Sequence, residues 1–190
     1  MTFTLTEEDK RILLLTAREA VSARLQRRPP RFPAPTPTLS TRCGAFVTLK
    51  IGHILRGCIG QITAAQPLID TVKEVSQSSA FEDPRFPAMQ PSEWDRVSIE
   101  ISVLSPFQRV ADPGSVLIGQ HGVMVRGRGR SGLLLPQVAT EQGWDRETLL
   151  THACRKAGLP GDAWKSSATE IEIFTATVFG ENEEQAQDRW

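Results

Sequence analysis

Two strand-like runs on either side of a tight turn constrain the fold of this chain most. The runs are CGAFVTLK (residues 43–50) and ILRGCIGQI (residues 54–62), and the sequence IGH joins them. Gly52 can supply the positive φ that a short hairpin turn requires. The sequence therefore predicts an antiparallel hairpin, with Cys58 late in its second strand or just beyond it.

The other elements alternate irregularly between helix and strand. Helical spacing of apolar residues and start signals at Thr6, Pro67 and Asp145 predict three helices. Strict alternation in VSIEISVL predicts the clearest strand of the chain. These patterns favour an α+β fold with a mainly antiparallel sheet. The expected helices cover about 6–26, 67–81 and 145–157, and the expected further strands cover 97–104, 122–127, 132–136 and 168–179.

Two segments have the composition of irregular chain. Five prolines in residues 27–41 exclude a helix and predict an extended, polyproline-like arm. The arm could be a ligand for a proline-reading domain, but its composition favours a stiff connector over the surface. The polar, acidic residues 181–190 predict a disordered tail after a single domain over residues 1–180.

Composition narrows the environment and the partners. The 22 basic and 22 acidic side chains cancel, so net charge gives no reason to expect a nucleic acid or an anionic membrane as partner. No basic leader precedes a long apolar run, which predicts a soluble, cytoplasmic protein. The cysteines at 43, 58 and 154 form no CxxC pair, which argues against a disulfide framework and against a structural zinc site. We expect neither a metal nor a cofactor.

Cys58 is the candidate nucleophile. In a regular strand, residues two apart share a face, so Arg56 and Cys58 are predicted to project together. A guanidinium beside a thiol favours the reactive thiolate. Gly57 and Gly60 leave room for a ligand or another backbone to approach. The alternative is a buried cysteine, with glycines that allow a bulge and Arg56 in a salt bridge, and the spacing alone favours this alternative.

Three more charged residues are candidates for the same site. Asp83 and Arg85 lie in the rigid corner FEDPRFP, where Arg85 could bind an anionic group and Asp83 or Glu82 could orient it. The corner could equally be a packed turn. Glu100 lies in the middle of a strand, and if that face is covered it needs a partner such as Arg56 or Arg85.

Other polar motifs give weaker signals. His53 and His121 lie in expected turns, from which either could reach Cys58, but no spacing requires it. Cys154 lies on the apolar stripe of its helix and is expected in the core. The arginines of VRGRGRSG lie between two expected strands without interleaved aromatics, which favours a hairpin turn over a nucleic-acid groove.

Five fragments together resemble the AMMECR family, whose prokaryotic members are called AmmeMemoRadiSam system protein A. The fragments are LRGCIG (55–60), FEDPRFP (81–87), IEISVLSP (99–106), LLLPQV (133–138) and KAGLP (156–160). The resemblance implies two unequal lobes, the larger built from both chain ends and the smaller within about 60–100, with the LRGCIG strand close to the cleft between them. It also implies a Memo-type protein and a radical S-adenosylmethionine protein as partners, but no established reaction.

The resemblance adds weight to the functional interpretation of Cys58. Its signature covers Leu55, Arg56, Gly57, Cys58, Ile59, Gly60, Asp83, Arg85, Phe86, Glu100 and Ser102, but neither His53 nor His121. We expect Cys58, Arg56 and Glu100 to act on a small or peptidic substrate. The expected binding residues are Gly57, Gly60, Asp83, Arg85, His53 and His121. The alternative function is a non-enzymatic adaptor with a structural cysteine, and a nucleic-acid-associated regulator comes third.

Overall fold

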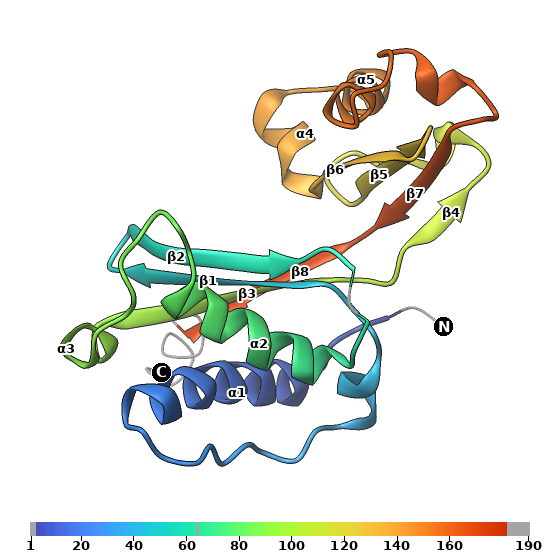
Figure 1. Ribbon diagram of the computed structural model, residues 1–190. Coiled ribbons are helices and arrows are strands. Elements are labelled where there is room, and N and C mark those ends of the chain that lie inside the picture. Colours follow the sequence, from blue (N-terminus) through green and yellow to red (C-terminus); the bar gives the residue numbers. More distant parts are fainter. Residues whose placement is uncertain (1–2, 64, 182–190) are drawn as a thin grey trace, which may run out of the picture. The chain divides into compact units, whose positions relative to one another are not determined.

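The computed structural model describes residues 3–63 and 65–181, which form two compact units with antiparallel sheets and flanking helices (Figure 1). Unit 1 combines the described residues before Ser105 with those from Thr177 onward, and unit 2 is Ser105–Ala176. The α+β prediction is confirmed. The range of about 60–100, where we expected the smaller lobe, lies inside unit 1, because its helix and strand pack with the N-terminal hairpin.

Unit 1 is built on a four-stranded sheet that contains the predicted hairpin. The strand order is β2-β1-β3-β8, so β2 is an edge strand. Gly52 has a φ of 62° in the turn between β1 and β2, as the hairpin prediction required. The strands are β1 (Ala45–Ile51), β2 (Ile54–Gln61), β3 (Val97–Leu104) and β8 (Ala176–Gly180).

Helices α1 (Glu7–Leu25) and α2 (Leu68–Phe81) lie side by side on one face of this sheet (Figure 1). The alternation of β1 and β3 directs fully buried side chains such as Val47, Leu49 and Ile101 toward them. Each such side chain contributes roughly 1.5–3 kcal/mol through burial. The short elements η1 (Pro37–Ser40) and α3 (Pro91–Trp94) complete unit 1. No helix in the described part of the chain is long and apolar enough to cross a membrane.

The start of α1 and the proline-rich arm are held by local polar contacts. Thr6 caps α1 by accepting the backbone N–H of Asp9, whose carboxylate accepts the N–H of Thr6 in return. The arm is held against α1 by Glu19, which accepts bonds from the Arg28 guanidinium and from the backbone N–H of Arg31. The Arg28 guanidinium lowers the pKa of Glu19 to about 2.

Unit 2 has its own four-stranded sheet, in the order β4-β7-β5-β6, with α5 packed on β5 and β6. The predicted hairpin at the RGRGR segment is present, with φ values of 52° and 72° at Arg128 and Gly129. The short helix α4, which begins at a proline, was not predicted. The elements are β4 (Gln108–Val110), η2 (Pro113–Ser115), β5 (Gly122–Gly127), β6 (Arg130–Leu134), α4 (Pro136–Gln142), α5 (Arg146–Lys156), η3 (Ala163–Lys165) and β7 (Glu170–Phe174).

The expected single strand over 168–179 is wrong, because it is divided between the two sheets. Its first part forms β7 in unit 2, and its second part forms β8 in the sheet of unit 1. At the break, the backbone N–H of Ser105 donates to the carbonyl of Thr175, and the N–H of Thr175 donates to Oγ of Ser105. The apolar pattern runs through both strands and therefore hid the break.

The end of the described chain is tied to α1. The Glu181 carboxylate accepts bonds from the Arg18 guanidinium, with Nε to Oε1 at 2.9 Å, and from the backbone N–H of Ile99 at 2.8 Å. Arg18 also donates to the carbonyl of Val97 and stacks on the ring of Trp94. Glu181, the first residue of the expected disordered tail, is thus part of the fold, and the other tail residues, 182–190, lie outside the described residues.

The variant Glu181→Ala is expected to lose about 2 kcal/mol of unfolding free energy, because it leaves the Ile99 N–H and the Arg18 guanidinium without their carboxylate. Urea unfolding measures the loss. Glu82→Ala is the matched control, because Glu82 is 60% exposed and pairs with Arg24 at 3.8 Å. The control should lose less than about 1 kcal/mol. Equal losses in the two variants would show that Glu181 does not anchor the chain end.

Candidate functional site

The sheet face of unit 1 opposite the helices carries Cys58. Cross-strand pairing aligns Cys58 with Thr48 of β1, and Thr48 with Glu100 of β3, so the three side chains form a row across the sheet. All three are half-exposed, and the Cys58 sulfur lies 3.3 Å from Oγ1 of Thr48. Glu100 pairs with Nζ of Lys50 at 2.8 Å, so its partner is neither Arg56 nor Arg85.

The corner after α2 holds the backbone of Cys58 at the open edge of β2. Asp83 Oδ2 accepts the Cys58 N–H at 2.8 Å, and Nη2 of Arg85 donates to the Cys58 carbonyl at 3.1 Å. These are backbone groups that an edge strand would otherwise leave to solvent. Asp83 is 4% exposed, so the corner is a packed turn that also supports the strand carrying the thiol.

Asp83 and Arg85 form a close charged pair. Nε and Nη2 of Arg85 donate to the two carboxylate oxygens at 3.0 and 2.7 Å. The Arg85 guanidinium, with help from the backbone N–H groups of Cys58 and Arg85, holds the pKa of Asp83 well below its usual range. The pKa of Arg85 is raised, mainly by Asp83 and to a smaller extent by the neighbouring Cys58. Arg85 is thus a cation close to Cys58.

Arg56 is not bonded to the thiol. A β-bulge interrupts the pairing of β1 with β2, because Leu49 aligns with Gly57 whereas Lys50 aligns with Leu55. The extra residue, Arg56, breaks the strict alternation on which its predicted place beside Cys58 depended. Its guanidinium instead bonds both carboxylate oxygens of Glu93, at 2.8 and 3.0 Å, and it is 9% exposed. This pair raises the pKa of Arg56.

The two glycines on either side of Cys58 allow close packing. A Cβ on Gly57 would lie 2.1 Å from the backbone oxygen of Ser79 in α2. A Cβ on Gly60 would lie 2.2 Å from the ring of Phe46, its cross-strand partner. The glycines were predicted to leave room either for a ligand or for another backbone. At Gly57 another backbone approaches, and at Gly60 a side chain fills the space.

The contacts of Cys58 described above involve neither the predicted histidines nor the other cysteines. His53 is exposed in the hairpin turn, more than about 10 Å along the strand from Cys58 at roughly 3.3 Å per residue. His121 belongs to unit 2, where its Nδ1 accepts the N–H of Leu117. Cys43 and Cys154 are buried, which raises the pKa of Cys43 to about 11 and also raises that of Cys154.

No group of three His, Cys, Asp or Glu side chains suited to a metal ion occurs within residues 3–63 and 65–181.

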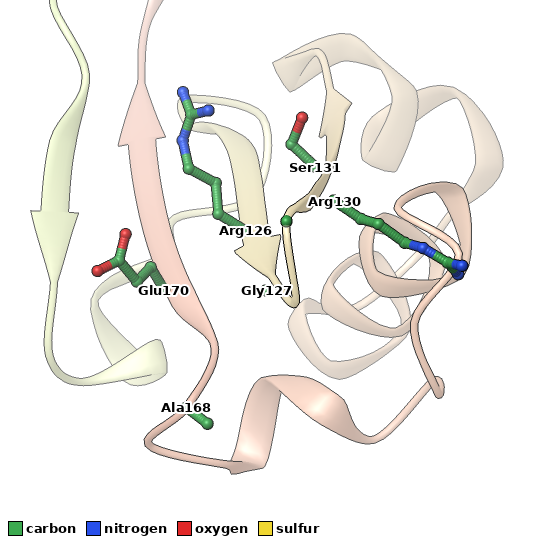
Figure 2. Close-up of a pocket in the computed structure, with 7 residues that line it drawn as sticks. Arg126, Gly127, Arg130, Ser131, Ala168 and Glu170 are labelled. Atoms are coloured by element: carbon green, nitrogen blue, oxygen red, sulfur yellow. The ribbon is translucent and has the colours of Figure 1, made fainter.

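The RGRGR hairpin of unit 2 lines a pocket of about 410 Å³, but its cations do not converge (Figure 2). Arg126 and Arg130 point in different directions from their strands. Arg126 is paired with Glu172 at 2.8 Å, and Arg130 donates to the carbonyl of Gly158. The ion pair neutralises the charge of Arg126, and the carbonyl bond occupies a donor of Arg130 that a nucleic-acid phosphate would need.

Sequence reasoning missed the residues that complete the environment of Cys58. Thr48 was missed because the bulge shifts the pairing by one residue, so counting back from the turn would have aligned it with Gly57. Ser79 was missed because its hydroxyl reaches across from α2, accepting the Ile59 N–H and donating to the Val47 carbonyl. A sequence carries no local signal for such a contact.

Comparison with known proteins finds relatives and a solved structure that match nearly the whole chain. The protein MK0488 of Methanopyrus kandleri is 42% identical over 200 residues, covering 97% of this chain and 94% of that protein. A protein of Methanothermobacter thermautotrophicus is 40% identical over 186 residues, covering 94% of this chain and 97% of its own. The crystal structure of the uncharacterized protein PH0010 from Pyrococcus horikoshii has the same fold, with a TM-score of 0.75, 36% identity and 93% coverage of both chains. The sequence pattern of the AMMECR1 family matches residues 14–179, and the chain therefore belongs to the AMMECR1 family.

Proposed function

We propose that unit 1 uses Cys58 as a thiolate nucleophile toward a small or peptidic substrate that lies on the helix-free face of its sheet. The observation that carries the proposal is the bracing of Cys58: its backbone N–H and carbonyl are both held by the Asp83–Arg85 pair, while the residue itself is only half-buried. A reacting group needs to be held in place without being covered. The bracing supplies the first condition and the open sheet face supplies the second.

Neighbouring groups have matching roles in this proposal. Arg85, rather than Arg56, is the cation beside Cys58 to which the proposal assigns the stabilisation of a thiolate. Thr48 contacts the sulfur directly, and the Lys50–Glu100 pair offers both charges to polar groups of a substrate. In this proposal the protein acts in the cytoplasm. Its reaction is one step of a modification pathway that it shares with a Memo-type protein and a radical S-adenosylmethionine protein. Thiolate attack is covalent catalysis and requires an electrophilic atom in the substrate.

The second candidate is a non-enzymatic adaptor that binds a partner segment on the same face. A specific observation favours it: Arg85 is already neutralised by both oxygens of Asp83, which weakens its field at the sulfur. In that case the signature residues serve to make β2 rigid, and the cysteine supplies a small side chain. The two candidates differ in the reactivity that they predict for the thiol.

Iodoacetamide labelling followed by peptide mass spectrometry measures that reactivity. The thiolate proposal predicts that Cys58 reacts at least tenfold faster than Cys43 and Cys154 in the folded protein, because those two are buried. It also predicts a midpoint pH for Cys58 labelling below the roughly 8.5 of a free thiol. Arg85→Ala should raise this midpoint, whereas Arg85→Lys, which keeps the charge, should raise it less.

The controls separate charge from folding. Arg109→Ala removes an exposed arginine of unit 2 and should leave the Cys58 midpoint unchanged. Circular dichroism checks that each variant is folded at the labelling temperature. An ordinary midpoint in the parent protein that does not respond to Arg85→Ala would exclude the thiolate and favour the adaptor.

A further inference from the structure

A second pocket of unit 2, of about 520 Å³, has the composition of a binding site for a small organic anion. One wall is the segment from β4 to η2, and the other runs from η3 to the start of β7. The residues that matter are Arg109 and Val110 on the first wall and Trp164, Lys165 and Glu170 on the second. The pocket lies within unit 2 and does not include Cys58.

The charged residues of the pocket leave one cation without a counter-ion. Nη1 of Arg109 lies 3.0 Å from Oε1 of Glu170, so these two charges neutralise each other. Nζ of Lys165 lies 5.0 Å from the centroid of the Trp164 ring, and among the described residues no carboxylate lies within salt-bridge distance of it. Lys165 is exposed, and as an unpaired cation among the lining residues it can attract an anion that enters the pocket.

The same pocket has a fixed apolar wall. The indole N–H of Trp164 donates to Oγ1 of Thr151 at 3.3 Å, which orients the ring. Trp164 and Val110 both pack against the buried cluster of unit 2, and Ile171 of the lining is 4% exposed. An apolar wall with a few polar groups at its border is the usual composition of a small-molecule site. Hydroxyl groups of Ser166, Ser167 and Thr169 supply further hydrogen-bonding capacity.

We propose that this pocket binds a small molecule with an oxyanion, carboxylate or phosphate, attached to an apolar body. The oxyanion pairs with Lys165, and the body contacts Trp164 and Val110. The lining of the pocket beside the RGRGR hairpin contains no aromatic or large aliphatic residue. Its arginines point apart and are bonded to protein acceptors (Figure 2).

Titration of the full chain with benzoate, phenyl phosphate and the neutral benzyl alcohol tests the proposal. The readout is the NMR signal of the Trp164 indole N–H, which Trp164→Phe identifies by its disappearance. Benzoate, phenyl phosphate or both should shift this signal saturably, with dissociation constants of about 1 mM or below, and benzyl alcohol should bind at least tenfold more weakly. Benzoate alone would identify a carboxylate site, and phenyl phosphate alone would identify a phosphate site.

Two variants separate the pocket charge from net charge. Lys165→Gln should weaken anion binding at least tenfold, whereas Lys156→Gln, an exposed lysine at the end of α5 outside the pocket, should change it less than twofold. The proposal is overturned if neither anion shifts the indole signal up to about 10 mM, if benzyl alcohol binds equally well, or if Lys165→Gln binds like the parent. None of these results depends on the reactivity of Cys58.

Discussion

Replacement of Gly57 by alanine is expected to lower the unfolding free energy by about 3 kcal/mol. The new methyl carbon would lie 2.1 Å from the backbone oxygen of Ser79, and neither backbone can give way without moving α2 from β2. Such a movement also stretches the bonds that the Ser79 hydroxyl makes to Val47 and Ile59, each 2.8 Å long. Packing and hydrogen bonding are therefore lost together.

Gly127→Ala provides the control, because Gly127 also lies in a strand but its added methyl would meet no backbone atom closer than 3.9 Å. The nearest atom is a methyl carbon of the Leu159 side chain at 3.2 Å, and the φ of Gly127 is not positive. We expect a loss below about 1 kcal/mol. Urea unfolding curves of both variants measure the difference. A Gly57→Ala protein as stable as the parent would mean that α2 does not pack this closely on β2.

Asp83→Asn is expected to cost about 2–3 kcal/mol, because a buried carboxylate that accepts several hydrogen bonds loses its charge. If the asparagine amide oxygen takes the place of Oδ2 and accepts the Cys58 N–H, its NH₂ group lies at the place of Oδ1, where Nε and the backbone N–H of Arg85 need an acceptor. The control is Asp70→Asn, which removes a partly exposed pair with Lys73 within one helical turn and should cost less than about 1 kcal/mol. Equal costs would show that the corner contributes no more than a surface ion pair.

The cost of Asp83→Asn should depend on pH. The folded-state pKa of Asp83 lies below its unfolded value of about 3.9, so its charge stabilises the fold fully above that value. This stability is lost as pH falls through the lowered folded-state pKa. The difference between parent and variant should therefore be constant from pH 7 to 5 and shrink below about pH 4. Glu19, with a pKa of about 2, titrates in both proteins, so its contribution cancels in the difference.

Local patterns predicted most elements of unit 1. The alternation of residues 97–104 gave β3 with its bounds, and Gly52 marked the hairpin turn. The Thr6 cap marked the start of α1. Each prediction succeeded because the signal and the structure involve residues close together in the chain. The strand over 168–179 failed because a continuous apolar pattern cannot show which sheet each half joins.

The candidate site, like the fold, has features that the local sequence predicted and features that it could not predict. The sequence alone identified the corner at Asp83 and Arg85 and the strand that carries Cys58, because rigid turns and glycines are local signals. It could not show that a bulge diverts Arg56 to Glu93, or that Arg85 is the arginine beside Cys58.

The sequence by itself determined the α+β class, the hairpin and the presence of a cysteine in the second half of that hairpin, since these depend on period, turn chemistry and residue type. Only the tertiary structure decided the partners: Thr48 against the thiol, Lys50 against Glu100, and Arg85 at the Cys58 carbonyl. Those contacts depend on strand register and on the close approach of α2. The extra residue Arg56 changes the strand register, and the missing side chain of Gly57 allows the close approach of α2. Neither alters the local sequence pattern.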